Sequence, residues 1–348
     1  RVRLMARIVL ADDGIEFDGE SPERGPLGGV ESSIVNLTRE LASRGHEVLV
    51  RNKCRVAKII EGVDWAPIEQ GLPKKADLYI ANRGDKLIPL MPGARRTVFW
   101  IHNPAQYLMK WRYLSKLWRY KPAIVFIGDY HATTYPAWAP SGERIVIPYG
   151  IADEFRSVEA LTEPPPPQAV FTSNPLRSLE WLLELWRTEI RPHAPKAELC
   201  LYSGAATYGA VGDAKKQEMK RVLDKAQSMS GEGVILNPPV PKAQLILAFR
   251  KSRVMLYRGD ANETFCLAVG EAQAVGVPSI VGKFGSVVER VVDGVTGTIA
   301  ETDQEFARAA VKLLTDEVLW REQHRAAIDQ QRKWGWPEAA MAFENLIS

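Results

Sequence analysis

Cysteine is scarce in this 348-residue chain: Cys54, Cys200 and Cys266 are far apart and form no CxxC pattern. We therefore expect neither a disulfide framework nor a cysteine zinc site, and a reducing cytoplasm is the simplest compartment. Long apolar runs are also missing, since none approaches the roughly 18–20 residues that a membrane-spanning helix needs. The short apolar run near the amino end, ARIVLA, is typical of a β-strand and not of a signal peptide.

Several motifs that carry well-known chemistry are absent as well. No GxGxxG follows the first expected strand and no GxxxxGK[ST] occurs, which argues against a dinucleotide fingerprint and a P-loop. HExxH and GxSxG are missing and the five histidines are scattered, so metalloprotease and serine-hydrolase functions are not favoured.

What the sequence does contain is a regular alternation of short apolar runs and helical patterns, which predicts parallel sheets built from βα units. The pattern is interrupted by four prolines at 164–167 and then starts again. We therefore predict an α/β protein with an N-terminal domain at 1–160 and a C-terminal domain at 161–336. Two doubly wound sheets of this kind place a ligand site in the cleft that their strand carboxyl ends face.

One candidate phosphate site precedes the first expected helix. Gly28 and Gly29 would let a backbone approach a phosphate closely, and the helix N-terminus offers unpaired N–H groups. Two glycines are also what an ordinary tight turn between a strand and a helix contains. The pair alone favours the turn.

The strongest signal is NETFCLAVGEA at 262–272, between the expected strands RVMLYRG and VPSIVG. If a helix begins near Cys266, Glu263 precedes it and Glu271 lies within it, at most roughly 12 Å away. That distance suits a sugar and a ribose on either side of a diphosphate, which the N–H groups of Phe265, Cys266 and Leu267 could hold. By spacing alone, one acid at a helix start and one solvated acid remain the simpler interpretation.

The segment NETFCLAVGEAQAVGVPSIV resembles the E-x7-E donor-site segment of the GT4 family of retaining glycosyltransferases, usually written E-G-F-G-x4-E-A-x-A-x-G-x-P-V. Further segments are similar to other parts of that family: GGVESSIVNLTRELASRGHEV, WIHNP, RIVIPYGI, KFGSVVERVVDGVTG and KWGWPEAAMAFENLI. The resemblance implies the GT-B fold, with two Rossmann-like domains facing across a cleft and a closing helix, 337–348, packed back on the first domain.

The resemblance also implies site roles. Glu263 would bind donor-sugar hydroxyls, Glu271 would accept hydrogen bonds from the ribose, and the amides of 265–267 and Gly29 would hold the diphosphate. His102, in WIHNP, would lie near the reacting sugar. A histidine capping a strand end is the alternative for His102, although its position at a strand's carboxyl end favours function.

The sequence departs from the family pattern at three places, of which the first concerns the diphosphate. Arg177 can stand where the family has a lysine, whereas the usual arginine is replaced by Ser173 or Asn174. Fewer cations stabilise the leaving diphosphate less, so Arg258 or Lys283 would have to compensate. Cys266 replaces a glycine, and PYGIA replaces the family's N-G-V-D.

For the reaction, the resemblance implies a hexosyltransferase that retains anomeric configuration, with the leaving phosphate helping to deprotonate the acceptor. No DxD pattern lies near the candidate site, so we expect no metal, and we expect no cofactor beyond the nucleotide-sugar substrate. The acceptor is expected to be a glycan, a glycolipid or another hydroxyl compound, in cell-surface polysaccharide or glycolipid synthesis.

The positive charge of the chain is concentrated at 107–121, YLMKWRYLSKLWRYK, which holds five Lys/Arg and no acid. Two sets of residues lie on different sides at helical spacing: Tyr107, Trp111, Leu114 and Trp118, and Arg112, Lys116 and Arg119. This composition is typical of a helix that docks on anionic lipid, which would place the protein at the inner membrane face. A helix whose aromatic side packs on the sheet is an equally good interpretation.

Other functions stay open at this stage. A sugar-nucleotide epimerase or a phosphorylase could use the same fold, although the E-x7-E match argues against both. A non-catalytic nucleotide- or glycan-binding protein is kept open by the missing arginine. Nucleic-acid binding is not expected, because no known module accompanies the basic aromatic stretch.

Overall fold

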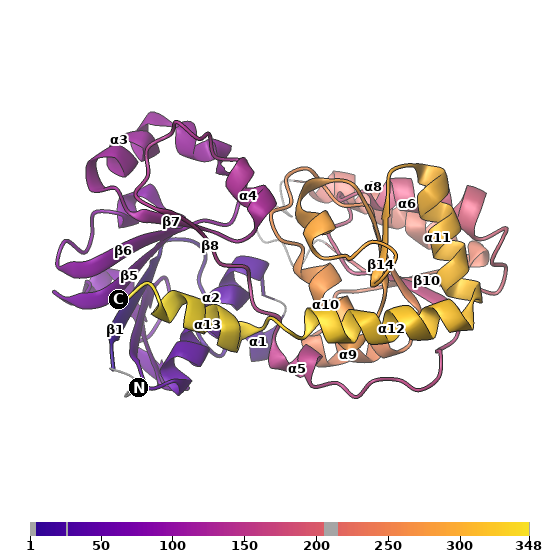
Figure 1. The fold of residues 1–348 in the computed structure, drawn as a ribbon, viewed down its shortest axis with the longest axis horizontal. Coiled ribbons are helices and arrows are strands. Elements are labelled where there is room, and N and C mark those ends of the chain that lie inside the picture. The colour runs from indigo at the N-terminus through magenta and orange to yellow at the C-terminus, as the bar shows by residue number, and fades with distance from the viewer. Residues whose placement is uncertain (1–4, 26, 205–214, 348) are drawn as a thin grey trace. The chain divides into compact units, whose positions relative to one another are not determined.

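The computed structural model describes residues 5–25, 27–204 and 215–347. The chain divides into two compact units, Arg1–Gly150 with Trp334–Ser348, and Ile151–Lys333 (Figure 1). Each unit is built around one sheet, as the alternating pattern of the sequence predicts.

The first unit contains an eight-stranded sheet in the order β3-β4-β2-β1-β5-β6-β7-β8. All neighbouring strands are parallel except the edge strand β3, which runs antiparallel to β4. The strands are β1 (Arg7–Asp12), β2 (Glu47–Asn52), β3 (Lys58–Ile60), β4 (Val63–Pro67), β5 (Ala76–Asn82), β6 (Ala94–Trp100), β7 (Ala123–Phe126) and β8 (Arg144–Val146). The order reverses between β1 and β5, which is where α/β sheets of this type bind ligands.

Helices cover this sheet: α1 (Ser21–Arg24), α2 (Gly29–Ser43), α3 (Trp111–Tyr120), α4 (Asp129–Thr133) and α13 (Trp336–Glu344), with 3-10 turns at Ile68–Gln70, Asp85–Leu87 and Ala105–Met109. The apolar positions of α2 recur every three or four residues. Ile34, Leu37 and Leu41 are therefore all buried on one face.

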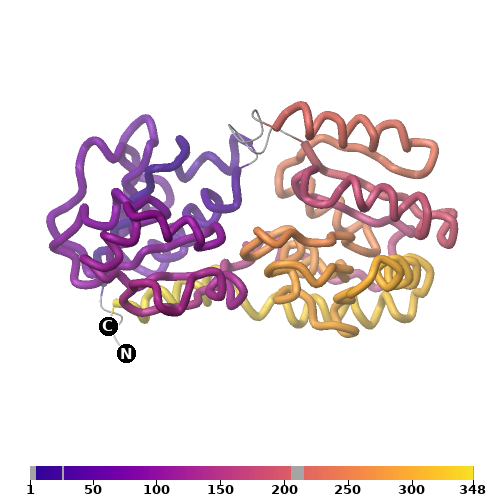
Figure 2. Tube along the Cα trace, turned by 90° about the horizontal axis from the view of Figure 1, so that it is seen from above, coloured from indigo at the N-terminus to yellow at the C-terminus, as the bar shows by residue number. Residues whose placement is uncertain are grey.

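The closing helix α13 belongs to the first unit, in which it contacts α2. In Figure 2 the yellow C-terminal segment lies beside the indigo and purple elements of this unit. Phe343 packs edge-on against Trp100 with 5.3 Å between ring centroids, and Glu344 pairs with Arg44 at 2.7 Å. Residues 243 and 300 positions apart in the sequence are thus joined in one unit.

The second unit contains a six-stranded, fully parallel sheet in the order β11-β10-β9-β12-β13-β14. Its strands are β9 (Gln168–Phe171), β10 (Glu198–Tyr202), β11 (Val234–Asn237), β12 (Val254–Tyr257), β13 (Ser279–Gly282) and β14 (Gly297–Ala300). Strands 1 to 6 of this unit thus lie in the order 3-2-1-4-5-6, which is the doubly wound Rossmann order. The order reverses between β9 and β12.

The helices of this unit are α5 (Asp153–Arg156), α6 (Leu179–Leu185), α8 (Lys216–Ser228), α9 (Lys242–Arg250), α10 (Leu267–Val275), α11 (Asp303–Thr315) and α12 (Glu317–Gln331). A π-helical turn follows α6 at Trp186–Ile190, and 3-10 turns occur at Ser230–Glu232 and Gly285–Glu289.

The division between the units falls at Gly150 and Ile151, ten residues before the boundary drawn at the tetraproline. Helix α5 packs on α10, and a side chain at Gly270 would collide with Ile151. The prolines lie within the second unit, where the carbonyl of Pro165 accepts a hydrogen bond from Arg253 Nε at 2.6 Å. Packing of α5 therefore places residues 151–160 with the second unit.

Candidate functional site

The sequence-predicted residues Arg177 and Glu263 meet where the strand order of the second unit reverses. Arg177 follows β9 and Glu263 follows β12, so both lie at the carboxyl ends of the two strands at the reversal. Arg177 Nη1 donates to Glu263 Oε1 at 2.6 Å, and Tyr257 donates its hydroxyl to Oε2 at 2.5 Å. One carboxylate is thereby held in a fixed orientation by two side chains.

Glu263 is 6% exposed. Burial raises the pKa of its carboxyl above the usual value, and Arg177 and then Tyr257 oppose this by stabilising the charged form. Tyr257 is the last residue of the buried strand β12 and was not identified from the sequence. Arg177, by contrast, was predicted from the sequence as a donor-binding residue. Its guanidinium points toward Glu263.

Helix α10 begins at Leu267, immediately after the predicted loop. Cys266 is its N-cap and has a left-handed backbone with φ of 63°, while Phe265 is buried beneath the Arg290 guanidinium at 4.2 Å. The family pattern has a glycine at the Cys266 position, and the left-handed conformation explains that preference. The first N–H groups of α10 have no partner within the helix itself.

Glu271 lies on α10, one turn from its start, and is 6% exposed. Lys242, the first residue of α9, donates a hydrogen bond to Glu271 Oε1, and its ammonium also lies 5.2 Å from the Phe155 ring centroid. The simple interpretation of Glu271 as a solvated acid is therefore wrong. Nothing in the sequence pointed to Lys242, because the two residues are 29 positions apart.

The two cations considered as replacements for the missing arginine have other contacts. Arg258 is stacked between the rings of Trp181 and Phe284, at 4.7 and 4.8 Å from their centroids. Lys283 pairs with Glu301 at 2.6 Å on the exposed surface. Neither contacts Arg177 or Glu263 among the interactions of the described residues.

In the first unit, His102 belongs to a buried hydrogen-bonded chain at the carboxyl ends of β1, β5 and β6. Asn82 Nδ2 donates to Asp12 Oδ1 at 2.7 Å, so the Asn82 carbonyl oxygen faces His102 Nε2 at 2.5 Å. That nitrogen must be the donor, which leaves Nδ1 to accept from the Tyr149 hydroxyl at 2.5 Å. The network thus assigns one tautomer to the imidazole.

Burial strongly lowers the pKa of His102, and the nearby Arg83 guanidinium lowers it further. The imidazole is 4% exposed and neutral at physiological pH. The structure thus places this predicted residue at the strand ends, with both ring nitrogens hydrogen-bonded to other side chains.

Arg83 was not found from the sequence, although it connects this network to the predicted Gly28-Gly29 site. Its guanidinium binds Asp12 through Nε at 2.8 Å and Glu31 through Nη2 at 2.9 Å. Gly28 is the N-cap of α2 and Gly29 its first residue, and a side chain at Gly28 would collide with the Glu31 carboxylate. The space beside Gly28 at the start of α2 is therefore occupied by the buried carboxylate of Glu31.

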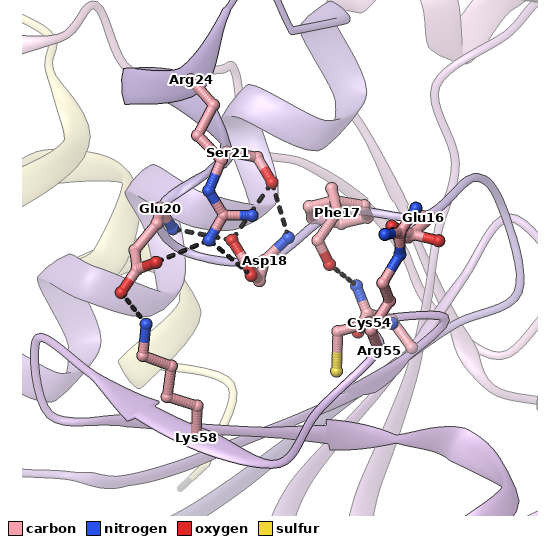
Figure 3. A network of polar contacts seen from close by, with 10 residues as sticks. Glu16, Phe17, Asp18, Glu20, Ser21, Arg24, Cys54, Arg55 and Lys58 are labelled. Atoms are coloured by element: carbon pink, nitrogen blue, oxygen red, sulfur yellow. Dashed lines mark hydrogen bonds and ion pairs between the residues drawn. The ribbon is translucent and has the colours of Figure 1, made fainter.

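The loop that leads to α2 is fixed by its own polar contacts (Figure 3). Arg24 pairs with Glu20 at 2.5 Å and with Asp18 at 3.2 Å, and Lys58 of β3 also contacts Glu20. The amide of Asp18 donates to the Ser21 hydroxyl at 2.9 Å. These contacts position the described part of the loop over the sheet edge.

The basic aromatic segment, residues 107–121, is not one helix: a 3-10 turn ends at Met109 and α3 begins at Trp111. Tyr113 and Leu117, four residues apart, face the core, whereas Trp111 and Trp118 are 79% and 71% exposed. The interpretation that the tryptophans pack on the sheet is therefore wrong. Tyr107 does pack against the core. It lies in the 3-10 turn before α3 and not on the helix itself.

Two features are absent from the described residues. No group of three His, Cys, Asp or Glu side chains is arranged to hold a metal ion in the described part of the chain. Within the same residues, no helix combines the length and the apolar character that crossing a bilayer requires.

Comparison with known proteins adds independent findings. Residues 204–334 match the family model of glycosyl transferases group 1. Over 112 residues the chain is 30% identical to the D-inositol 3-phosphate glycosyltransferase of Corynebacterium aurimucosum, an alignment that covers 32% of this chain and 26% of the relative. The chain thus matches about a quarter of the length of this curated relative.

Solved structures resemble the whole chain. The sucrose-phosphate synthase of Thermosynechococcus elongatus superposes with a TM-score of 0.71 at 15% identity, covering 98% of both chains. The Anabaena protein HepE, solved in complex with UDP-glucose, gives a TM-score of 0.69 at 15% identity and the same coverage. These likenesses confirm the GT-B fold class that the sequence predicts.

Proposed function

We propose that this chain, whose residues 204–334 match the family model of glycosyl transferases group 1, transfers a hexose from a nucleoside diphosphate sugar to an acceptor hydroxyl, with retention of configuration. The observation that supports it most is the grouping of Arg177, Glu263 and the start of α10 at the strand reversal of the second unit. Ligands of α/β proteins bind at such reversals.

In this proposal, the second unit binds the donor. Glu263, held by Arg177 and Tyr257, accepts hydrogen bonds from the sugar hydroxyls. The N–H groups at the start of α10 hold the diphosphate, where the helix dipole favours negative charge. Glu271 accepts from the ribose hydroxyls, and the neighbouring Lys242 holds this carboxylate in place through an ion pair.

The chemical step breaks the bond between the sugar's anomeric carbon and the diphosphate and forms a bond from that carbon to the acceptor oxygen. The acceptor's proton passes to the leaving phosphate oxygen. Arg177 and the α10 amides stabilise the charge that grows on the diphosphate. His102 takes no proton in this scheme, since it is buried, neutral and hydrogen-bonded at both nitrogens.

We further propose that the reaction needs neither a metal ion nor a cofactor. The support is that no DxD pattern lies near the candidate site and that a cation, Arg177, lies beside Glu263 there. Turnover should therefore be unchanged after dialysis against EDTA. A loss of activity that Mg²⁺ or Mn²⁺ restores would contradict this part of the proposal.

The acceptor is proposed to be lipid-linked, used at the inner face of a membrane in glycolipid or surface-polysaccharide synthesis. The support is α3, which presents Trp111 and Trp118 to solvent beside Arg112 and Arg119. Exposed tryptophans next to cations suit the interface of a bilayer that contains anionic lipid.

Donor binding is tested by a thermal-shift screen of UDP-, GDP-, ADP- and dTDP-sugars on the wild type and on Glu271→Ala. A ligand at about 100 times its Kd should add roughly 2.7 kcal/mol to the stability of the native state. The shift should disappear in Glu271→Ala and persist in the control Glu301→Ala, which removes an exposed carboxylate of the same unit. No shift with any nucleotide would refute the donor site.

Catalysis is tested separately by following nucleotide release and sugar transfer in Glu263→Gln. We expect nucleotide affinity to change little while turnover falls by about 10²-fold or more, as for other losses of transition-state stabilisation. Nucleotide binding without any turnover, in the wild type and with a range of acceptors, would favour the non-catalytic alternative instead.

Membrane docking is tested by sedimentation with vesicles of phosphatidylcholine and phosphatidylglycerol at low salt. The double variant Trp111→Ser, Trp118→Ser should stay in the supernatant. Trp138→Ser serves as the control, because Trp138 is equally exposed but lies outside α3. Failure of the wild type to sediment with these vesicles would refute docking.

A further inference from the structure

A cavity of about 340 Å³ lies at the carboxyl end of α3, at the edge where β6, β7 and β8 begin. Three cations line it, Arg95, Arg96 and Lys121, against one carboxylate, Glu143. The polar side chains of Thr97 and Tyr120 complete the polar lining. Its volume is about ten times the roughly 30 Å³ that one water molecule occupies in the liquid.

Arg96 is the cation of this cavity that is best placed to bind an anionic ligand. It is flanked by Glu143, with 2.9 Å between Nη2 and Oε1, and its side chain is 33% exposed. Its Nε is buried and has no hydrogen-bond partner among the described residues. A buried donor without an acceptor is unfavourable, and an oxygen of a bound ligand would satisfy it.

Lys121 contributes a second feature. It ends α3 with a left-handed backbone, φ 42° and ψ 50°, a conformation that costs a non-glycine residue free energy. Its carbonyl packs so closely on Gly142 that a side chain there would collide with it. In the described part of the chain no carboxylate lies within ion-pairing distance of Lys121. Residues held in strained conformations concentrate at functional sites.

We propose that this cavity binds the phosphate of an anionic lipid headgroup while Trp111 and Trp118 enter the bilayer. The inference rests on the membrane docking proposed above and adds a specific lipid site to it. The occupant is a bilayer lipid and not a free phosphate, because Tyr120 and Lys121 belong both to the cavity lining and to the exposed end of α3. The cavity is thus continuous with the docking helix.

The site can be distinguished from general attraction between a basic surface and an anionic membrane. General attraction depends on exposure, so Arg119 on the outer side of α3 should matter more than Arg96, which is mostly buried and paired. Losing one exposed cation near a membrane should weaken partitioning about fivefold. If the cavity binds a headgroup, loss of Arg96 should instead weaken vesicle binding more than loss of Arg119.

The experiment measures binding of the full chain to phosphatidylcholine vesicles that contain phosphatidic acid. We expect Arg96→Gln to weaken binding about tenfold or more, the equivalent of roughly 1.4 kcal/mol, and Arg119→Gln no more than about fivefold. Equal losses, or a larger loss for Arg119→Gln, would overturn the headgroup site while leaving membrane docking intact. No vesicle binding by the wild type would overturn both.

Lys121→Gly separates binding from folding. Glycine removes the cation and relieves the left-handed strain, so the variant should melt no lower than the wild type and still bind vesicles more weakly. Lys196→Gly, the same change at an exposed turn of the second unit, should bind like the wild type. A Lys121→Gly variant with wild-type affinity would count against the proposal.

The source of the phosphate is tested with two further arms. Vesicles given the same surface charge by oleate, a carboxylate, should bind the wild type more weakly than phosphatidic acid vesicles do. Glycerol phosphate in solution should compete only weakly, because it lacks the anchoring contribution of the bilayer. Equal binding to both kinds of vesicle, or saturation by soluble glycerol phosphate alone, would overturn a lipid headgroup as the ligand.

Discussion

Arg83 is the residue on which the buried polar network of the first unit depends. Its guanidinium lies between Asp12, which is fully buried, and Glu31, and it has a left-handed backbone with φ of 52°. Removing one partner of a buried ion pair leaves an uncompensated charge, which is far more costly than breaking an exposed pair.

We therefore expect Arg83→Met to lower the free energy of unfolding by about 3 kcal/mol or more. Arg7→Met is the matched control, since the Arg7–Glu47 pair at the other end of the same sheet is half exposed and should contribute far less to stability. Urea unfolding of the two variants measures the difference. Similar losses in both would contradict the role given to Arg83.

His131 makes the stability of the first unit sensitive to acid. Burial lowers the pKa of His131 to about 4, while its carbonyl partner Asn103 acts in the opposite direction. In the unfolded chain the pKa is about 6.5. The unfolded chain therefore takes up this proton before the folded protein does as the pH falls. The contribution of His131 to the free energy of unfolding is complete above pH 6.5 and is lost as the pH falls through 6.5 toward 4, with a total loss of at most about 3 kcal/mol.

The measurement is urea unfolding between pH 7 and pH 4 for the wild type and for His131→Asn. Asparagine can still accept from the Ile127 amide, as His131 Nδ1 does at 3.2 Å, but it does not titrate. We expect a flatter dependence of stability on pH in the variant. Parallel curves would show that other groups cause the acid sensitivity.

At the scale of an element, α10 shows how a single backbone conformation can be tested. Cys266 begins this helix in the left-handed region and is buried, so replacing it with glycine both removes strain and removes a thiol. Cys266→Gly and Cys266→Ala both lack the thiol, so the difference in stability between them reports the backbone conformation alone.

We expect Cys266→Gly to be more stable than Cys266→Ala by about 0.5–1 kcal/mol, because the left-handed penalty exceeds the extra flexibility of glycine in the unfolded chain. Thermal unfolding of the two variants side by side measures this. If alanine is the more stable of the two, the left-handed conformation at the start of α10 is not the determining factor.

At the scale of the whole molecule, the end of the chain stabilises the unit formed by its beginning. Phe343 of α13 is buried against Trp100 of β6, whereas Met341 of the same helix is exposed. We expect Phe343→Ala to cost about 3–5 kcal/mol and Met341→Ala less than about 0.5 kcal/mol.

Hydrogen exchange locates that loss. In Phe343→Ala, amides of α2 and β6 should exchange faster, while amides of β9 to β14 should keep wild-type protection. Equal loss of protection in both units would contradict the assignment of α13 to the first unit alone.

The sequence predicted more of the second unit's site than of the first unit's. Glu263 and Glu271 could be found because they lie in one continuous loop and helix, where spacing along the chain is also spacing in space. Tyr257 and Lys242 could not, because each reaches its glutamate only through the packing of separate elements. The network around Arg83 and His102 joins the ends of several strands and is equally invisible in one dimension.

Local patterns in the sequence by themselves determined the alternation of strands and helices, the doubly wound class of both sheets and the segment of the predicted donor site. These properties depend on periodicity and on neighbours along the chain. Only the tertiary structure decided that α5 joins the second unit, that Trp111 and Trp118 face solvent, and that Arg83 pairs with Asp12 and Glu31. Each of these depends on which distant residue fills the adjacent space, and a helical or strand period does not contain that information.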